Sequence, residues 1–525
     1  MAITNTVAPT DLKLPAYRPI IFECTSDRYS SDNNVVPSVS SGTAGVARFA
    51  SVAHTFQVGD LIMGDNFSVL HDEYNVRMVV VTISANWFES TVLYVGTDTG
   101  DFTRDNNDFQ IKGDVWVFNK AILNILSVDA QDGKARYLTN IAHDYIVGDL
   151  VLIKGTTIYD GAQIVTYITN STQFVTGAIA YVSTQTGTVR GGNFVGSSRM
   201  KPLSSSSFRF NTSEFLKAVL TYNLETLGGA TFVSPNENSI LDHALKYTEE
   251  FNNIDNLLTA YGTKTSAVRK AVNATRQHLD TQSMVTTYYT DSTTRKFLTN
   301  SPETVLIRES DEFQLSFLVP DNGQSYKYVQ QPYGLSGAAL TQIVGSLVAI
   351  AGERGIIPIN GFLSTWSKVE VWLKLNAGTV STEVKTFVID RRINCDAIRL
   401  TWLNRLGGFD SYTFTGNLDN EVSVGRTSFV RDLGISFATS DRGQTQLGVS
   451  VNDTFVIYSE FIDNATAIWL SELLSSPVVY SIEDVNGTNS YVPISLLHTN
   501  QVKKVANGMF QIKLNYKYSN SPISQ

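Results

Sequence analysis

The sequence contains little charge, and its basic residues are scattered. Asp, Glu, Lys and Arg make up 17% of the 525 residues, against about 25% in an average soluble domain. The net charge is −9, and the densest basic spots are the pairs Arg391–Arg392 and Lys503–Lys504. A groove for nucleic acid needs clustered Lys and Arg that neutralise several phosphates. We therefore predict that the protein does not bind nucleic acid.

Cysteine is nearly absent. The only two thiols, Cys24 and Cys395, lie far apart in the sequence. Two thiols cannot by themselves build a disulfide framework or a metal site. We predict that both are free and buried; a single bridge between them is the alternative.

The sequence also lacks a long apolar run. The most apolar stretch, residues 340–359, is interrupted by two polar and two charged residues, Thr341, Gln342, Glu353 and Arg354, which makes it too short and too polar for a membrane span. Residues 1–14 contain neither the basic nor the apolar region of a secretory signal. We expect a protein without a membrane span that is made in a cytoplasm and stays there, or leaves by lysis or through a dedicated machine.

Compact catalytic and metal-binding motifs are missing. There is no Gly-x-Ser-x-Gly elbow, P-loop or dinucleotide fingerprint. The six histidines have no metal-ligand spacing; they are His54, His71, His143, His243, His278 and His498. We predict that the protein is not an enzyme and uses no metal or cofactor.

Two groups of acidic residues are candidate exceptions. Glu309 and Asp311 resemble the carboxylate pair of a glycosidase, but 49 acidic residues supply such pairs by chance. A second group surrounds Gly100 without the EF-hand pattern; it consists of Asp98, Asp101, Asp105 and Asp108. We interpret the second group as an acidic loop.

An internal duplication is the most informative feature that is present. Residues 47–60 read ARFASVAHTFQVGD, and residues 135–149 read ARYLTNIAHDYIVGD. In both copies a β-branched run follows, and each copy closes on a similar phrase, TVLYVGTDTG at 91–100 and AIAYVSTQTG at 178–187. Each copy is a series of short strands separated by turns, which is typical of a small barrel or sandwich. His54 and His143 occupy equivalent positions, each followed two residues later by an aromatic residue, and duplication of a fold position explains this pairing without chemistry.

Strand signals dominate the rest of the chain. Residues 313–317, 369–375 and 510–518 alternate between apolar and polar side chains, as half-buried strands do. One helix is expected after Asp463 or Asn464, either of which can cap it, with Ala465, Ile468, Trp469 and Leu473 on one side. Residues 240–251 and 267–279 are weaker helix candidates, since neither has a clean 3.6-residue stripe.

These signals predict a mostly β, multidomain protein of β-sandwich and small β-barrel modules. A tandem duplicated insert separates strand-like segments at 17–24 and 207–211, and a C-terminal β domain carries one helix. The predicted domains are 1–45 with 191–235 (an N-terminal β domain split by the insert), 46–100 and 134–190 (the two small β modules), 236–300 (a mixed junction), 301–420 (a β-sandwich) and 421–525 (the β domain with one helix).

The densest cluster of aromatic residues lies in a predicted hairpin. A strand at 397–403 leads through a turn with two glycines into a second strand at 411–414. The candidate interface residues of this hairpin are Trp402, Arg405, Leu406, Phe409 and Tyr412. Two hypotheses fit them: a core hairpin, or a contact between subunits, because aromatic residues and Arg anchor interfaces.

The run RLTWLNRLGGFDSYTF resembles segments of virion structural proteins from tailed bacteriophages and prophages of Bacteroidota hosts. The tandem AHxxxVGDL modules resemble small β-inserts of phage tail and fibre proteins, and the ending WLSELLSSPVVY with YVPISLL is similar to C-terminal domains of the same proteins. The resemblance implies a tail or baseplate component of the virion, made in the cytoplasm of a bacterial host. Its implied partners are further copies of itself and other virion proteins, and it implies no catalytic residues.

Three functions fit these features to different degrees. A multimeric tail, tail-tip or baseplate protein fits the low charge, the tandem modules and the missing catalytic motifs. A receptor-binding adhesin or tail fibre that recognises the host surface is the alternative, although no collagen-like or coiled-coil stalk is present. A virion-borne polysaccharide-cutting enzyme fits least, because such enzymes are often β-helices with many short repeats.

Overall fold

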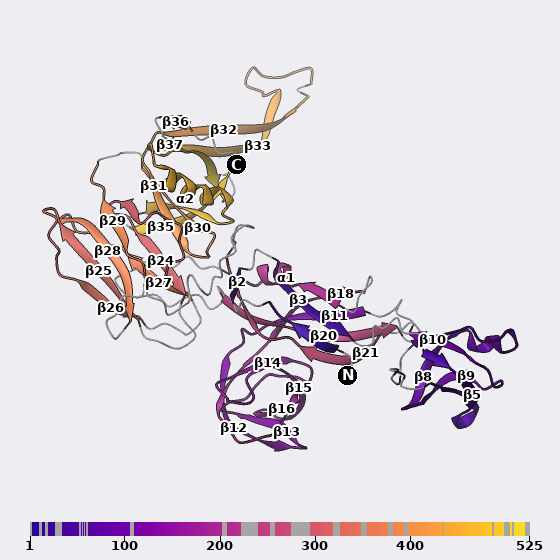
Figure 1. The fold of residues 1–525 in the computed structure, drawn as a ribbon. Helices are drawn as coiled ribbons and strands as arrows, with labels where there is room; N and C mark the ends of the chain where they lie inside the picture. Colours follow the sequence, from indigo (N-terminus) through magenta and orange to yellow (C-terminus); the bar gives the residue numbers. More distant parts are fainter. Residues whose placement is uncertain are drawn as a thin grey trace. The chain divides into compact units, whose positions relative to one another are not determined.

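The computed structural model describes residues 3–9, 13–15, 19–26, 34–51, 54, 56, 58, 61–104, 110–201, 207–221, 240–252, 258–274, 295–318, 326–347, 354–375, 382–392, 397–432, 434–485, 488–497, 504–506 and 509–519. Over these residues the protein is mostly β, with two α-helices (Figure 1). The predicted fold class is confirmed. The chain divides into two compact units, Met1–Leu220 with Ile240–Val272, and Thr221–Ser239 with Asn273–Gln525.

The first unit contains two sheets formed from segments far apart in the sequence. A three-stranded sheet has the order β1 (Ile3–Val7), β3 (Ile21–Ser26) and β19 (Ser207–Asn211). A six-stranded sheet contains β18 (Asn193–Met200), β11 (Gln110–Val117), β20 (Ile240–Asn252), β22 (Arg269–Val272) and β2 (Lys13–Pro15), with β21 (Leu258–Thr265) paired to β20. The short helix α1 (Ser213–Lys217) follows β19. β3 and β19, which flank both repeats, pair through Phe22 with Phe210 and Cys24 with Phe208.

The prediction of a helix at 240–251 is wrong, because these residues form strand β20. β20 pairs with β11 on one side and with β21 and β22 on the other. Leu241, Ala244 and Leu245 are buried in this central position, and pairing on both sides overrides the helix propensity of Leu, Ala, Lys and Glu. The second candidate, 267–279, contains strand β22, and its residues after 274 lie outside the described part.

The second repeat is a closed six-stranded barrel. Its strand order is β12 (Ile122–Gln131), β13 (Lys134–Thr139), β16 (Gln173–Ala180), β15 (Gly161–Asn170), β14 (Leu150–Lys154) and β17 (Gly187–Gly191), and β17 pairs back to β12. The first repeat has the corresponding order β5 (Ser38–Ser41), β6 (Val46–Ala50), β9 (Trp87–Leu93), β8 (Arg77–Ser84), β7 (Leu61–Asp65), β10 (Gly100–Arg104) and β4 (Asn34–Val36), with short 3-10 turns η1 (Thr43–Gly45) and η2 (Val69–Tyr74).

Pro37 explains why the first repeat has one more strand than the second. β4 pairs with β10 and β5 pairs with β6, and only Pro37 separates them. In the second repeat the single strand β12 makes both pairings, with a register shift between Ile125 and Ser127. Because proline has no N–H to donate, it is compatible with such a bulge position. In the second repeat the strand that closes the barrel, β12, precedes the repeated phrase, and in the first repeat β4 and β5 precede it.

The second unit contains two large sheets and a short strand pair. The five-stranded sheet has the order β23 (Thr304–Ile307), β29 (Lys385–Ile389), β28 (Trp366–Leu375), β25 (Tyr326–Gly334) and β26 (Ile343–Leu347). The strands β24 (Phe313–Leu318) and β27 (Arg354–Ile359) pair with each other. The seven-stranded sheet has the order β31 (Phe409–Phe414), β30 (Ile398–Leu403), β34 (Val479–Val485), β35 (Thr488–Leu496), β38 (Lys513–Tyr518), β33 (Gln444–Tyr458) and β32 (Leu418–Val430). A small pair, β36 (Lys504–Ala506) with β37 (Met509–Gln511), completes the unit.

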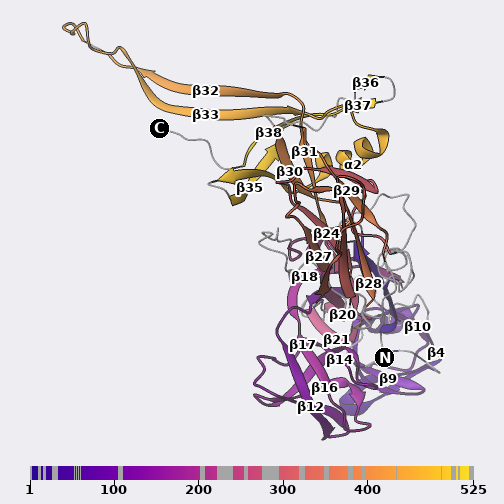
Figure 2. The same ribbon diagram turned by 90° about the vertical axis from the view of Figure 1, so that its left-hand side faces the viewer.

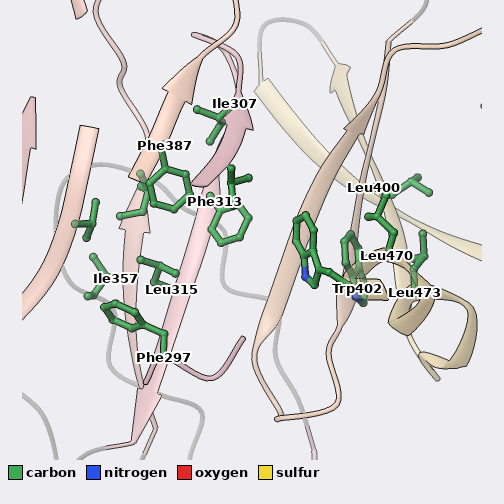
Figure 3. Close-up of a cluster of buried hydrophobic side chains, with 14 of the residues drawn as sticks. Phe297, Ile307, Phe313, Leu315, Ile357, Phe387, Leu400, Trp402, Leu470 and Leu473 are labelled. Carbon is green, nitrogen blue, oxygen red and sulfur yellow. The ribbon is translucent and has the colours of Figure 1, made fainter. Parts of the chain in front are cut away.

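One hydrophobic core joins these sheets. It extends in sequence from Phe297 to Tyr516. Figure 3 shows Phe313 close to Phe387 on one side of this core, and Trp402 close to Leu470 and Leu473 on the other. β30 and β31 pair with the C-terminal strands rather than with the preceding sheet, so the expected boundary at 420/421 falls within one continuous sheet.

The predicted helix is α2 (Asn464–Ser475). Trp469 and Leu473 are buried as predicted, but Ile468 is exposed and Ala467 and Leu470 are buried instead. The buried stripe is therefore shifted by about one position from the one read in the sequence.

Candidate assembly surface

The predicted hairpin is present, and its aromatic residues belong to the core. β30 and β31 pair from Ile398 with Phe414 to Leu403 with Phe409. Trp402, Leu406 and Phe409 are buried, while Arg405 and Tyr412 are half-buried. Of the two hypotheses for this hairpin, burial favours the core hairpin, because the three buried side chains could contact a partner only by leaving the core.

The two glycines of this hairpin are required by close packing. Gly407 has φ +87°, and a Cβ atom on it would lie 2.4 Å from the carbonyl oxygen of Asn273. A Cβ on Gly408 would lie 2.6 Å from the carbonyl oxygen of Leu298. Asn404 closes the turn, since its Oδ1 accepts hydrogen bonds from the N–H groups of Leu406 (2.9 Å) and Gly408 (3.0 Å).

A group of buried ionisable side chains lies behind the hairpin. Asp410 is fully buried, and its Oδ2 accepts a hydrogen bond of 2.7 Å from Nε1 of Trp469. Burial raises the pKa of the Asp410 carboxyl to about 7 and also raises the pKa of Glu472, because a charged carboxylate loses hydration in the interior. Glu472 accepts hydrogen bonds from Nδ2 of Asn300 (2.7 Å) and from the N–H of Arg405 (3.3 Å). These contacts tie α2 to the hairpin.

A cavity of about 380 Å³ lies beside this group in the second unit. Tyr412 and Trp469 line it together with Asp390, Arg392 and Glu460. Arg392 donates to Oδ2 of Asp390 (2.7 Å) and to Oε2 of Glu460 (2.8 Å). These three charged groups are thus engaged with one another within the chain.

The most exposed element of the second unit is a long two-stranded arm formed by β32 and β33. The strands pair antiparallel from Leu418 with Ile457 to Val430 with Gln444. Every residue of β32 after Leu418 is exposed, and β33 pairs with the neighbouring β38 only at residues 455–458. In Figure 2 the two strands run side by side away from the rest of the second unit.

The arm has two different faces. Cross-strand partners share a face, and successive residues alternate between faces. One face, here called the valine face, carries Val422, Val424, Val430, Val449 and Val451. The other face is mostly polar or small near its centre, with Glu421, Ser423, Gly425, Ser450 and Thr454, and it carries Phe429 toward the tip.

The valine face is open to solvent in the isolated chain. Val422 is 56% exposed and Val424 46% exposed. At the tip of the arm, Ile435 is 103% and Phe437 62% exposed. A two-stranded ribbon is marginally stable alone in water, and an exposed, flat apolar strand is a template for association. The arm is therefore a surface that a partner can cover.

This arm is not among the elements predicted from the sequence. The sequence pattern that indicates it is the alternation of Val422 and Val424 with Glu421 and Ser423. Val449 and Val451 continue this pattern on the second strand. An alternating pattern predicts one buried face, but it does not reveal that the chain itself leaves that face uncovered.

The two repeats place their equivalent residues alike. The ring of His54 stacks on Phe56 at 5.7 Å, and the ring of His143 stacks on Tyr145 at 4.8 Å. Burial lowers the pKa of His143. Both histidines pack against aromatic rings of their own module, as a duplicated fold position requires.

The duplication extends to two tyrosines that the sequence analysis did not single out. The hydroxyl of Tyr74 donates to the carbonyl oxygen of Gly96 (2.9 Å) and accepts from the N–H of Val95 (2.9 Å). The hydroxyl of Tyr159 makes the same contacts with Ser183 (2.9 Å) and Val182 (2.9 Å).

The carboxylates that were candidates for a glycosidase pair or a calcium loop accept hydrogen bonds from other side chains. Oε1 of Glu309 accepts from Nε of Arg391 (2.9 Å), and Oδ2 of Asp311 accepts from Nη1 of Arg399 (2.9 Å) in a buried pair. Oδ2 of Asp98 accepts from the hydroxyl of Ser68 (2.7 Å), and Oδ2 of Asp101 accepts from Nδ2 of Asn66 (2.9 Å). Asp105, Asp108, His278, His498 and Cys395 lie outside the described residues, whereas Cys24 is buried, and burial raises the pKa of its thiol to about 12.

Comparison with known proteins gives no relative: no protein-family model matches the chain, and no curated protein matches it significantly. Among the described residues, no group of three or more His, Cys, Asp or Glu side chains is placed to hold a metal ion. Within the same residues, no helix is long and apolar enough to cross a membrane.

Proposed function

We propose that this chain is a structural component of a bacteriophage virion, a multimeric tail, tail-tip or baseplate protein that acts by assembling with other proteins. The observation that carries the proposal is the β32–β33 arm, on whose valine face Val422 and Val424 are exposed to solvent. Exposed apolar surface on an ordered element is typical of protein–protein contacts. The low charge, the tandem barrel modules and the resemblance of 399–414 to virion proteins support the same role.

Purified particles test this proposal. We expect mass spectrometry of phage particles, purified by density gradient from a lysate of the host that carries the gene, to detect the chain in several copies per particle. Immunogold labelling should then place it on the tail. A chain that remains in the soluble fraction while intact particles lack it would refute a virion role.

The tip of the first barrel module favours a second function, attachment to the host surface. In η2, Val69 is 94% and Leu70 86% exposed. Exposed apolar residues at a loop tip are suited to insertion into a partner's pocket. Binding of the purified chain to host cells, lost in a Val69→Ser/Leu70→Ser variant, would support this alternative.

A further inference from the structure

The arm is symmetric about its centre in a way that permits self-association. β32 runs from Leu418 to Val430, and its middle residue, Val424, pairs with Val451. These two valines are therefore the centre of the valine face. On either side of them, the next pairs on this face are Val422 with Asp453 and Arg426 with Val449.

The two charges of the central part of the face are opposite in sign and equally distant from its centre. Arg426 lies two residues from Val424 toward the tip, and Asp453 lies two residues from Val451 toward the base. Both are exposed. Nη1 of Arg426 donates to Oε1 of Gln446 at 3.1 Å within the arm, which holds the guanidinium on this side of the ribbon.

We propose that two copies of this chain pack their arms valine face against valine face, related by a two-fold axis that crosses the strands at the Val424–Val451 pair. This inference rests on the assembly function proposed above and names its first partner, a second copy of the chain. The rotation reverses the direction of the second arm, so its tip points toward the base of the first. Such an interface is isologous, with the same patch contributed by both copies.

The charge pattern selects this arrangement. Reversal of the second arm brings Arg426 level with Asp453 of the other copy, and the symmetry creates the same pair a second time. Sheets pack about 10 Å apart face to face, a gap that an Arg and an Asp side chain bridge together. Two arms packed in the same direction would bring Arg426 level with Arg426 of the other copy, where like charges oppose each other.

The apolar residues match in the same register. The four central valines, Val424 and Val451 of both copies, meet at the two-fold axis. Edge-to-edge pairing of two β32 strands would instead leave the valine face in water. Face-to-face packing is therefore the arrangement that covers this face.

The buried area requires the tip as well. A ribbon of thirteen residues is about 40 Å long and about 10 Å wide, so each arm would bury about 400 Å² through its face. A standard interface buries about 800 Å² on each partner. The exposed tip residues Ile435 and Phe437 supply further apolar area for contact with the second copy.

Charge reversal on the full-length chain tests the proposal. We expect the wild-type chain to be dimeric, or a multiple of dimers, by sedimentation equilibrium. Arg426→Asp opposes two aspartates, and Asp453→Arg opposes two arginines, at each symmetric pair. Each single variant should weaken self-association by roughly 100-fold or more, with unchanged circular dichroism and thermal unfolding.

Mixing the two single variants provides the decisive measurement. A chain with Arg426→Asp and a chain with Asp453→Arg complement each other at both pairs, so the mixture should form heterodimers. The double variant R426D/D453R should associate with itself again. A loss caused only by local misfolding would not be restored by mixing.

Glu421→Arg and Thr427→Asp are matched controls, because they change the charge of the opposite face, and they should leave self-association unchanged. A wild-type chain that stays monomeric at every concentration tested, single variants that associate normally, or a mixture that fails to restore association would each overturn the proposal. Detection of the chain in purified particles is independent of these outcomes, so failure of arm pairing and failure of the virion role can be told apart.

Discussion

Asp410 is a buried carboxylic acid, and its hydrogen bond and its raised pKa both bear on the stability of the second unit. Its carboxyl group lies in the core of the second unit, where Nε1 of Trp469 donates to it. The same burial that raises its pKa to about 7 would cost free energy if the group were charged. Between pH 3.8 and about 7, this carboxyl group keeps its proton in the folded state and releases it on unfolding.

The stability of the second unit should depend on pH through Asp410. Between the ordinary pKa of 3.8 and the raised value of about 7, the folded chain binds more protons than the unfolded chain. The free energy of unfolding contributed by this group therefore falls as the pH rises through this window. Asp410→Asn should flatten this dependence and stabilise the protein at pH 8, since its amide oxygen still accepts from Trp469.

Urea unfolding followed by tryptophan fluorescence at pH 5, 6, 7 and 8 checks this expectation. Asp410→Ala serves as the control, because it also removes the titrating group but leaves Trp469 without its acceptor, and it should be less stable than Asp410→Asn at each pH. Parallel pH profiles for wild type and Asp410→Asn would contradict the assignment.

Among the elements, the helix depends on neighbouring residues, whereas the closing strands of the second repeat depend on pairing between distant ones. Either Asp463 or Asn464 could cap the helix by sequence, and the structure selects Asp463, whose Oδ1 accepts from the N–H of Thr466 at 2.8 Å. In the two repeats, Pro37 stands where the corresponding strand of the second repeat shifts register, so the first repeat is a seven-stranded sheet and the second a closed barrel. A local cap is visible in sequence, whereas barrel closure depends on pairing between distant strands.

Because Asp463 is the N-cap, substitutions at Asp463 and at its neighbour Asn464 should differ in their effect on stability. Asp463→Ala should lower the free energy of unfolding by about 1 kcal/mol, because it leaves the N–H of Thr466 without its side-chain acceptor. Asn464→Ala, one residue further on, lies inside the helix and should change stability by less than half of that. Thermal unfolding of the two variants side by side measures the difference; equal losses would show that Asp463 is not the cap.

At the scale of the whole molecule, the chain consists of two units with separate cores. All residues of the larger core lie between Phe297 and Tyr516, and each sheet of the second unit pairs its strands within that unit. The first unit draws on both sides of the repeats, so it cannot be cut from the chain as one early segment.

The second unit should therefore fold alone. A fragment of residues 273–525 is expected to show a cooperative thermal unfolding transition and a β-type circular dichroism spectrum, because it contains the whole of its core. The matched fragment 301–420, which follows the boundaries expected from sequence, should not fold, since it separates β30 and β31 from their partner β34. Cooperative unfolding of the shorter fragment would argue that the seven-stranded sheet is not one unit.

The sequence by itself determined the fold class, the duplication, the 398–414 hairpin and the presence of one C-terminal helix, because each depends on patterns within a few neighbouring residues or on direct repetition. It could not determine that 240–251 is a central strand, that the 420/421 boundary falls inside one sheet, or that Trp402 and Phe409 point into the core. Those outcomes depend on which distant strands pair. The valine face of the arm was decided in the same way: alternation predicts a face to be covered, and only the tertiary structure shows that Val422 and Val424 stay exposed.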